Sequence, residues 1–127
     1  MIVYKGRKNW LLEGFIAVLL GWTIMIPDLR ITVLRIFHPD EVFGDGYPIE
    51  KQDWMGPCNI HYEGQEYIVH DGEMPEGFCS GAWVAIYPHI RMLTMGGNMP
   101  GDDRGIALGS CNDGLRPVIY KIQRVDN

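Results

Sequence analysis

The sequence predicts a small single-domain α+β fold, built from a mostly antiparallel sheet or a partial barrel and one main helix at about residues 79–94. First, 46% of the 127 residues are apolar and 21% are charged, a balance that allows a chain of this length to bury one hydrophobic core. Second, short runs rich in β-branched residues are separated by Gly, Pro and Asp turns, as in an antiparallel sheet. Third, one segment has apolar residues at helical spacing. We assign residues 1–27 to a hydrophobic N-terminal extension and residues 28–127 to the domain.

The first strand is expected at residues 30–37, where β-branched residues are frequent. Alternation along this strand predicts that Ile31, Val33 and Arg35 share one face. The remaining elements follow in chain order: a helical turn at 38–43, a loop at 44–57, a strand at 66–70 closed by the turn Asp71-Gly72, an irregular stretch at 73–77, the main helix from Ser80 to Leu93, a loop at 99–105, and strands at 106–111 and 117–125. Pro88 is expected to kink the main helix or to begin a second turn. The last two strands are expected to form a hairpin.

The N-terminal extension contains the most hydrophobic run of the chain, residues 10–27, which follows a basic stretch at 5–8. This order is typical of a signal or a signal anchor. However, Glu13 interrupts the run, and its uncharged part at 14–27 is 14 residues long, whereas a membrane span needs about 20. We therefore expect a packed helix, or upstream sequence read through a misplaced start before Met25. Membrane association is expected only if the run is a true anchor.

Charge and cysteine content narrow the class of function. The net charge is −5, and the Lys and Arg residues of the domain stand singly among acids, so nucleic-acid binding is not expected. Three cysteines cannot all pair within one chain, and a chain with a sufficient core needs no disulfide to fold. We therefore expect reduced thiols and a cytoplasmic location.

Cys79 is the candidate catalytic residue. It stands just before the expected helix, where unpaired backbone N–H groups and the helix dipole favour a thiolate. The base for such a nucleophile would be one of the four histidines, His38, His61, His70 and His89. Cys111 ends an expected strand, and strand ends commonly meet helix starts in α+β domains. We therefore expect it near Cys79, where the two would act as a redox pair or as shared metal ligands.

A metal site is a further hypothesis. Cys58 and His61 have the two-residue gap that allows one turn to present sulfur and nitrogen to a single metal. A zinc site needs four ligands, which here would be contributed by three separate segments, namely Cys58, His61, Cys79 and Cys111. The cofactor would be zinc or an iron–sulfur cluster. The spacings match no compact zinc finger or ribbon, so chance co-occurrence is the alternative.

The chain also contains a series of short motifs. In order they are Cys58, Gly64-Gln65-Glu66-Tyr67, Pro75-Glu76-Gly77-Phe78-Cys79, Ala82-Trp83, Gly96-Gly97-Asn98 and Cys111-Asn112-Asp113-Gly114-Leu115-Arg116-Pro117-Val118. Together they resemble a family of short, uncharacterised bacterial and archaeal proteins, over about Ile31 to Val125. The resemblance implies that all three cysteines belong to the family pattern and that His61 does not. It therefore implies a three-thiolate site completed by water, substrate or a partner, and it implies no particular activity.

Two classes of function remain open. In the first, the three cysteines form a thiolate site that binds zinc or an iron–sulfur cluster or performs redox chemistry, with an unknown small-molecule substrate. In the second, the chain is a non-catalytic interaction module or a homo-oligomer whose cysteines belong to the core. Its interface would then be formed by exposed apolar loop residues such as Trp54, Met55, Met95 and Met99.

Overall fold

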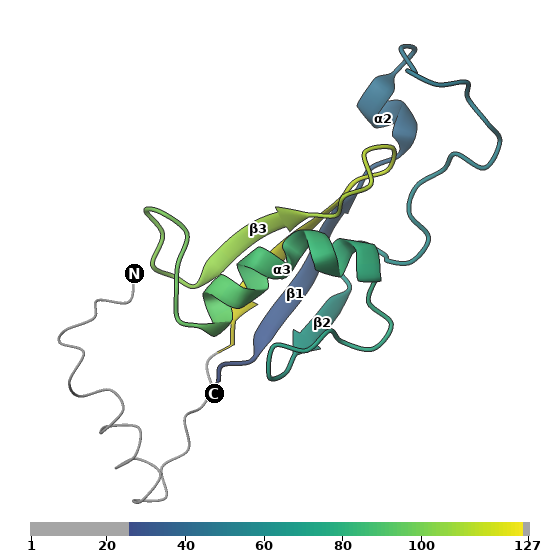
Figure 1. Ribbon diagram of the computed structural model, residues 1–127. Coiled ribbons are helices and arrows are strands. Elements are labelled where there is room, and N and C mark those ends of the chain that lie inside the picture. The colour runs from purple at the N-terminus through teal and green to yellow at the C-terminus, as the bar shows by residue number, and fades with distance from the viewer. Residues whose placement is uncertain (1–25, 126–127) are drawn as a thin grey trace, which may run out of the picture.

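A computed structural model describes residues 26–125, which form a four-stranded antiparallel sheet and one long helix (Figure 1). The elements are β1 (Leu29–Ile36), α2 (Pro39–Phe43), β2 (Glu66–Val69), α3 (Ser80–Thr94), β3 (Ile106–Ser110) and β4 (Val118–Arg124). Within the described residues the strand order is β2-β1-β4-β3, and the sheet remains open rather than closing into a barrel. The predicted α+β class is therefore confirmed. The expectations for residues 1–25 lie outside the described part of the chain.

Within residues 26–125, no helix combines the length and the apolar character that crossing a membrane requires.

β1 pairs with β2 on one side and with β4 on the other. Its inward side chains, Leu29, Ile31 and Val33, are fully buried. The register with β4 then shifts between Val33 and Arg35, which marks a β-bulge. Because a bulge inserts one extra residue, it reverses the alternation of side chains beyond it. Arg35 is consequently exposed and pairs with Ile119, so the prediction that it shares a face with Ile31 was wrong.

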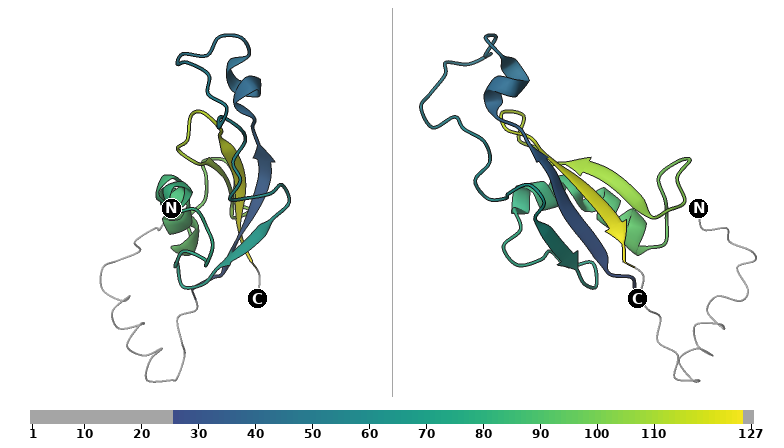
Figure 2. Two further views of the ribbon diagram at one scale, coloured as in Figure 1. Left: turned by 90° about the vertical axis from the view of Figure 1, so that its right-hand side faces the viewer. Right: turned by 180° about the vertical axis from the view of Figure 1, so that it is seen from behind.

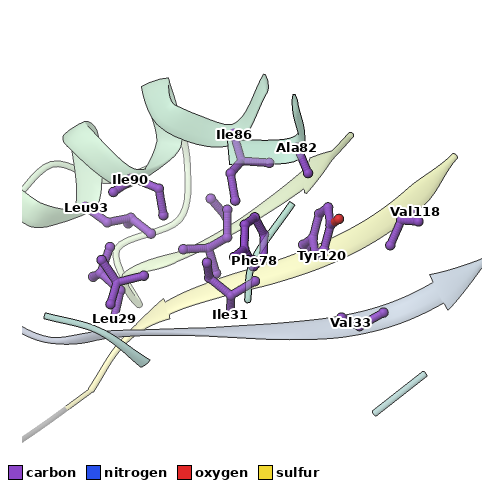
Figure 3. Packing of buried hydrophobic residues seen from close by; sticks show 13 residues of the cluster. Leu29, Ile31, Val33, Phe78, Ala82, Ile86, Ile90, Leu93, Val118 and Tyr120 are labelled. Atoms are coloured by element: carbon purple, nitrogen blue, oxygen red, sulfur yellow. The ribbon is translucent and has the colours of Figure 1, made fainter. Parts of the chain in front are cut away.

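α3 covers one face of the sheet, as the turned views show (Figure 2). Its buried residues Ala82, Ile86, Ile90 and Leu93 recur at helical spacing and pack against the inward side chains of the strands (Figure 3). Pro88 lies within the helix on an exposed position, so α3 continues through it and no second helix begins there. The expected main helix is confirmed within one residue at its C-terminal end.

β3 and β4 pair antiparallel, as expected for a hairpin. At the far end of β4, the Arg124 guanidinium donates hydrogen bonds to the backbone carbonyls of Leu93 and Gly97 and to the side chain of Asn98. These acceptors lie at and just beyond the C-terminal end of α3, where backbone carbonyls have no partner within the helix. Arg124 therefore fixes this end of the helix to the sheet.

α2 and the loop after it extend beyond the end of β1, away from the middle of α3 (Figures 1 and 2). In this loop Trp54 is 62% exposed, whereas Met55 is only 5% exposed. Met95 is 56% exposed, and Met99 is half-buried against the core. The expectation of exposed apolar residues thus holds for Trp54 and Met95 and is wrong for Met55, whose side chain the folded loop turns inward.

Candidate functional site

A pocket of about 90 Å³ is lined by all three cysteines. Cys58 comes from the loop before β2, Cys79 directly precedes α3, and Cys111 directly follows β3. Each is a free thiol and is half-buried. His61 lines the same pocket, so the fold gathers the four residues that the sequence proposed as metal ligands, whereas the other candidate bases, His38, His70 and His89, lie outside its lining.

Cys79 is the N-cap residue of α3, as expected from the sequence. Its backbone is extended (φ −67°, ψ 120°), and its carbonyl accepts the hydrogen bond from the Trp83 N–H that starts the helix. Its side chain makes no capping hydrogen bond, and the first turn of α3 contains no acidic residue. The positive end of the helix dipole therefore faces this end of the pocket without a compensating carboxylate, and negative charge that forms here is stabilised.

Cys111 is held by two hydrogen bonds to Val118, the first residue of β4. The Cys111 N–H donates to the Val118 carbonyl at 3.0 Å, and the Val118 N–H donates to Cys111 Sγ at 3.2 Å. The end of the β3–β4 hairpin thus determines where this sulfur points.

Gly81, in the first turn of α3, lies next to the segment that contributes Cys111. A Cβ atom at Gly81 would stand 3.5 Å from the Asn112 side-chain oxygen and 3.9 Å from Cys79 Sγ. The first turn of α3 therefore lies beside the loop that follows β3. Cys79 and Cys111 line the same pocket, and their direct pairing stays a prediction.

Tyr120 of β4 lines the pocket, and its phenol group lies near the three cysteines. The side chain is fully buried, and Figure 3 shows its ring between Phe78 and Val118, below Ala82. Its hydroxyl has no hydrogen-bond partner among the described residues. Burial raises the pKa of Tyr120, and the nearby Cys111, Cys79 and Cys58 raise it further, so the phenol keeps its proton at neutral pH.

His61 forms the pocket wall next to Tyr120 and is only 6% exposed. Its ring packs edge-on against the Tyr120 ring, with 5.6 Å between centroids. Nδ1 is hydrogen-bonded to the Tyr67 hydroxyl at 3.0 Å, whereas Nε2 has no partner in the described part of the chain. Burial lowers the pKa of His61 more than the neighbouring Gln65 raises it. Gln65 itself accepts a hydrogen bond from the Tyr62 N–H. Because the pKa of His61 is lowered from 6.5, the imidazole is neutral at pH 7.

Asp113 and Arg116 form the polar rim. Arg116 Nε donates to Asp113 Oδ2 at 3.1 Å, and the Leu115 N–H donates to Asp113 Oδ1 at 2.9 Å. Partial burial raises the pKa of Asp113, but these hydrogen bonds outweigh it and lower the pKa overall. The two charges at the rim therefore compensate each other.

The arrangement differs from a ready-made metal centre. Within residues 26–125, no three His, Cys, Asp or Glu side chains are grouped closely enough to hold a metal ion. Cys58, His61, Cys79 and Cys111 thus share a pocket without forming a coordination shell. Zinc or iron–sulfur binding stays a prediction.

Sequence reasoning did not identify Tyr120, Asp113 or Arg116 as site residues. Tyr120 belongs to the apolar face of a strand, where its alternation with Val118 and Ile122 indicates only core packing. The one available signal was its hydroxyl group, which is unusual at a position that the pattern predicts to be fully buried.

Comparisons with protein-family models, curated proteins and solved structures found no match for this chain.

Proposed function

We propose that the protein performs thiol redox chemistry, with Cys79 as the attacking thiol and Cys111 as its disulfide partner. The observation that supports this is the convergence of the three cysteines, from segments far apart in the sequence, on one pocket. We choose Cys79 and Cys111 as the pair because the first turn of α3 lies beside Asn112, the residue that follows Cys111. The proposal includes the cytoplasmic location that the cysteine content predicts, because the reaction starts from reduced thiols.

The reaction can be written with a low-molecular-weight disulfide as oxidant. The Cys79 sulfur attacks one sulfur of the disulfide, which forms a mixed disulfide and releases one thiol. Cys111 then attacks the Cys79 sulfur, which forms the protein disulfide and releases the second thiol. The two cysteine protons leave with the two released thiols. The N-terminal end of α3 stabilises the negative charge on Cys79 during the first attack.

Redox chemistry fits the site better than metal binding because it makes smaller geometric demands. A disulfide needs two sulfurs that reach each other, with Cα atoms about 4.4–6.8 Å apart. A structural zinc site needs four ligands at once. Among the described residues, the Cys79 and Cys111 segments lie side by side, but no three metal-binding side chains are grouped.

Disulfide mapping tests the proposal. The reduced protein is treated with oxidised glutathione, and the remaining thiols are alkylated and identified by mass spectrometry. The wild type and Cys58→Ser should both form the Cys79–Cys111 bond, whereas Cys79→Ser and Cys111→Ser should not. Three freely alkylated cysteines after oxidation would contradict the proposal.

Metal binding is a second candidate, favoured by Nε2 of His61, which has no partner among residues 26–125 and lies in the same pocket as the three cysteines. Purification without chelator, followed by metal and sulfide analysis, tests it. About one metal ion per chain that is lost in Cys58→Ala and in His61→Ala would support a four-ligand site. Metal retained in His61→Ala but lost in Cys58→Ala would indicate the three-thiolate site that the family resemblance implies.

An interaction module is the remaining candidate, favoured by the exposure of Trp54 and Met95. Sedimentation of the wild type and Trp54→Ala tests it. If Trp54 belongs to an interface, the variant should dissociate at a higher protein concentration than the wild type. In this case Cys79 would tolerate Ala better than Ser without loss of association.

A further inference from the structure

Two buried polar atoms at the pocket lack a partner among residues 26–125: the Tyr120 hydroxyl and Nε2 of His61. Their side chains are 0% and 6% exposed. A buried polar group without a hydrogen bond costs about 1–3 kcal/mol, so native proteins rarely keep two in one place without a use. Both residues line the pocket that contains the three cysteines. The pair therefore points to a ligand that forms hydrogen bonds beside a sulfur.

Size and charge narrow the chemistry of that ligand. The pocket holds about 90 Å³, which is smaller than an engineered apolar cavity of roughly 150 Å³ that binds benzene. Arg116 is paired with Asp113, His61 is neutral, and Tyr120 keeps its proton, so the walls offer no uncompensated charged side chain. These properties fit a molecule of a few non-hydrogen atoms that is uncharged and can both donate and accept hydrogen bonds.

We propose that this ligand is a small hydroperoxide, which reacts with Cys79 while the Tyr120 hydroxyl donates a hydrogen bond to the departing oxygen. This inference rests on the proposed thiol redox function and names its oxidant. A hydroperoxide enters uncharged and develops negative charge only as its O–O bond breaks. That charge develops where the N-terminal end of α3 and a phenol donor are already in place.

The atoms balance in two steps. The Cys79 thiolate attacks one oxygen of hydrogen peroxide, the S–O bond forms and the O–O bond breaks. Cys79 becomes a sulfenic acid, and the departing hydroxide takes up the proton that the thiol had released, giving water. The Cys111 sulfur then attacks the Cys79 sulfur, the S–S bond forms and the S–O bond breaks. The second hydroxide takes the Cys111 proton, so two thiols and one peroxide give one disulfide and two water molecules.

The test measures how fast the full reduced chain consumes three oxidants: hydrogen peroxide, the bulkier cumene hydroperoxide, and oxidised glutathione. Hydrogen peroxide should react at least about tenfold faster than with free cysteine, and cumene hydroperoxide should not share this acceleration because the pocket is too small. A sulfenic-acid trap followed by mass spectrometry should place the first oxidation on Cys79.

Tyr120→Phe keeps the ring and removes the hydroxyl, and it should slow the peroxide reaction about tenfold or more. Tyr87→Phe is the matched control, because Tyr87 is an exposed tyrosine of α3 outside the pocket. Equal peroxide rates in the wild type and Tyr120→Phe would overturn the role of the hydroxyl. The comparison of oxidants in the wild type remains decisive if that variant fails to fold.

The outcomes separate this inference from the function on which it rests. If glutathione forms the Cys79–Cys111 bond but peroxide reacts no faster than with free cysteine, the inference fails and the redox proposal stands. If no oxidant forms the bond and no sulfenic acid is trapped on Cys79, both fail. A trapped sulfenic acid without a disulfide would support the peroxide site and contradict Cys111 as the partner.

Discussion

The backbone N–H of Val118 donates a hydrogen bond to the sulfur of Cys111 at 3.2 Å. Val118 is almost completely buried, so water cannot readily replace the sulfur as acceptor. Cys111 therefore contributes to the end of the β3–β4 hairpin as well as to the pocket. The two contributions can be separated by substitution.

Cys111→Ala is expected to lower the free energy of unfolding by about 1–2 kcal/mol, because it leaves the buried Val118 N–H without an acceptor. Cys111→Ser supplies a hydroxyl oxygen at the same place and should be less destabilising than Ala. Urea unfolding measures both. Cys58→Ala is the control, since no described hydrogen bond reaches the Cys58 sulfur. A similar loss in Cys58→Ala and Cys111→Ala would contradict a specific role for the hydrogen bond.

Tyr120→Phe is expected to raise the free energy of unfolding by about 1 kcal/mol, because it removes a buried hydroxyl that has no partner within residues 26–125. The same substitution slows the proposed peroxide reaction, so stability and reactivity should change in opposite directions. Thermal and urea unfolding measure the first effect. Tyr87→Phe should leave stability nearly unchanged. A clear destabilisation by Tyr120→Phe would show that the hydroxyl does have a hydrogen-bond partner in the native protein.

Stability is expected to fall in mild acid through His61. Burial lowers the pKa of His61 in the folded protein from 6.5, the value expected for an unfolded chain, so the unfolded state takes up the proton first. The contribution of neutral His61 to the free energy of unfolding is complete above pH 6.5. It is lost as the pH falls from 6.5 to the lower pKa of His61 in the folded protein. Urea titrations between pH 7.5 and 5 measure this slope, and His61→Gln should flatten it.

His70 provides a control because its pKa is shifted in the opposite direction to that of His61. Its hydrogen bond to Asp28, followed by the charge of Asp71, raises the pKa of His70 in the folded protein. The contribution of protonated His70 to the free energy of unfolding is present at low pH and is lost as the pH rises through the folded pKa. His70→Gln removes this contribution, so the free energy of unfolding should fall slightly more steeply as the pH is lowered. The effect is small because the side chain is exposed. A flatter slope in His70→Gln than in His61→Gln would contradict the assignment.

Arg124→Met is expected to lower the free energy of unfolding by about 2 kcal/mol, because three acceptors at the end of α3 lose a charged donor. Gly105→Ala should act in the same direction. Gly105 has a φ of +72°, and an added Cβ would stand 2.8 Å from the Arg124 guanidinium. Chemical unfolding measures both variants and their double mutant, whose loss should be smaller than the sum. Arg91→Met, on an exposed position of α3, is the control.

Local signals in the sequence were sufficient for most elements. Apolar residues at helical spacing indicated α3, and β-branched runs between Gly-rich turns indicated the strands and the hairpin. The position of Cys79 at the N-cap followed from the same local reasoning, because helix starts depend on the neighbouring few residues. The resemblance to short uncharacterised prokaryotic proteins stays a prediction.

Other features depend on contacts between distant segments, which local patterns do not encode. The bulge in β1 exposes Arg35 because of its register with β4, and the fold of the loop buries Met55. Alternation in β4 is typical of a strand with one buried face, but it does not indicate that the phenol of Tyr120 lies near three cysteines.

The sequence by itself therefore determined the fold class, the main elements and the cysteines as candidates for chemistry, because propensity and periodicity act within a few residues. Only the tertiary structure decided that Cys58, Cys79 and Cys111 line one pocket with His61 and Tyr120. The physical reason is that the packing of α3 on the sheet brings a loop, a helix start and a strand end together. The residues of any one of these segments do not determine that the three lie together.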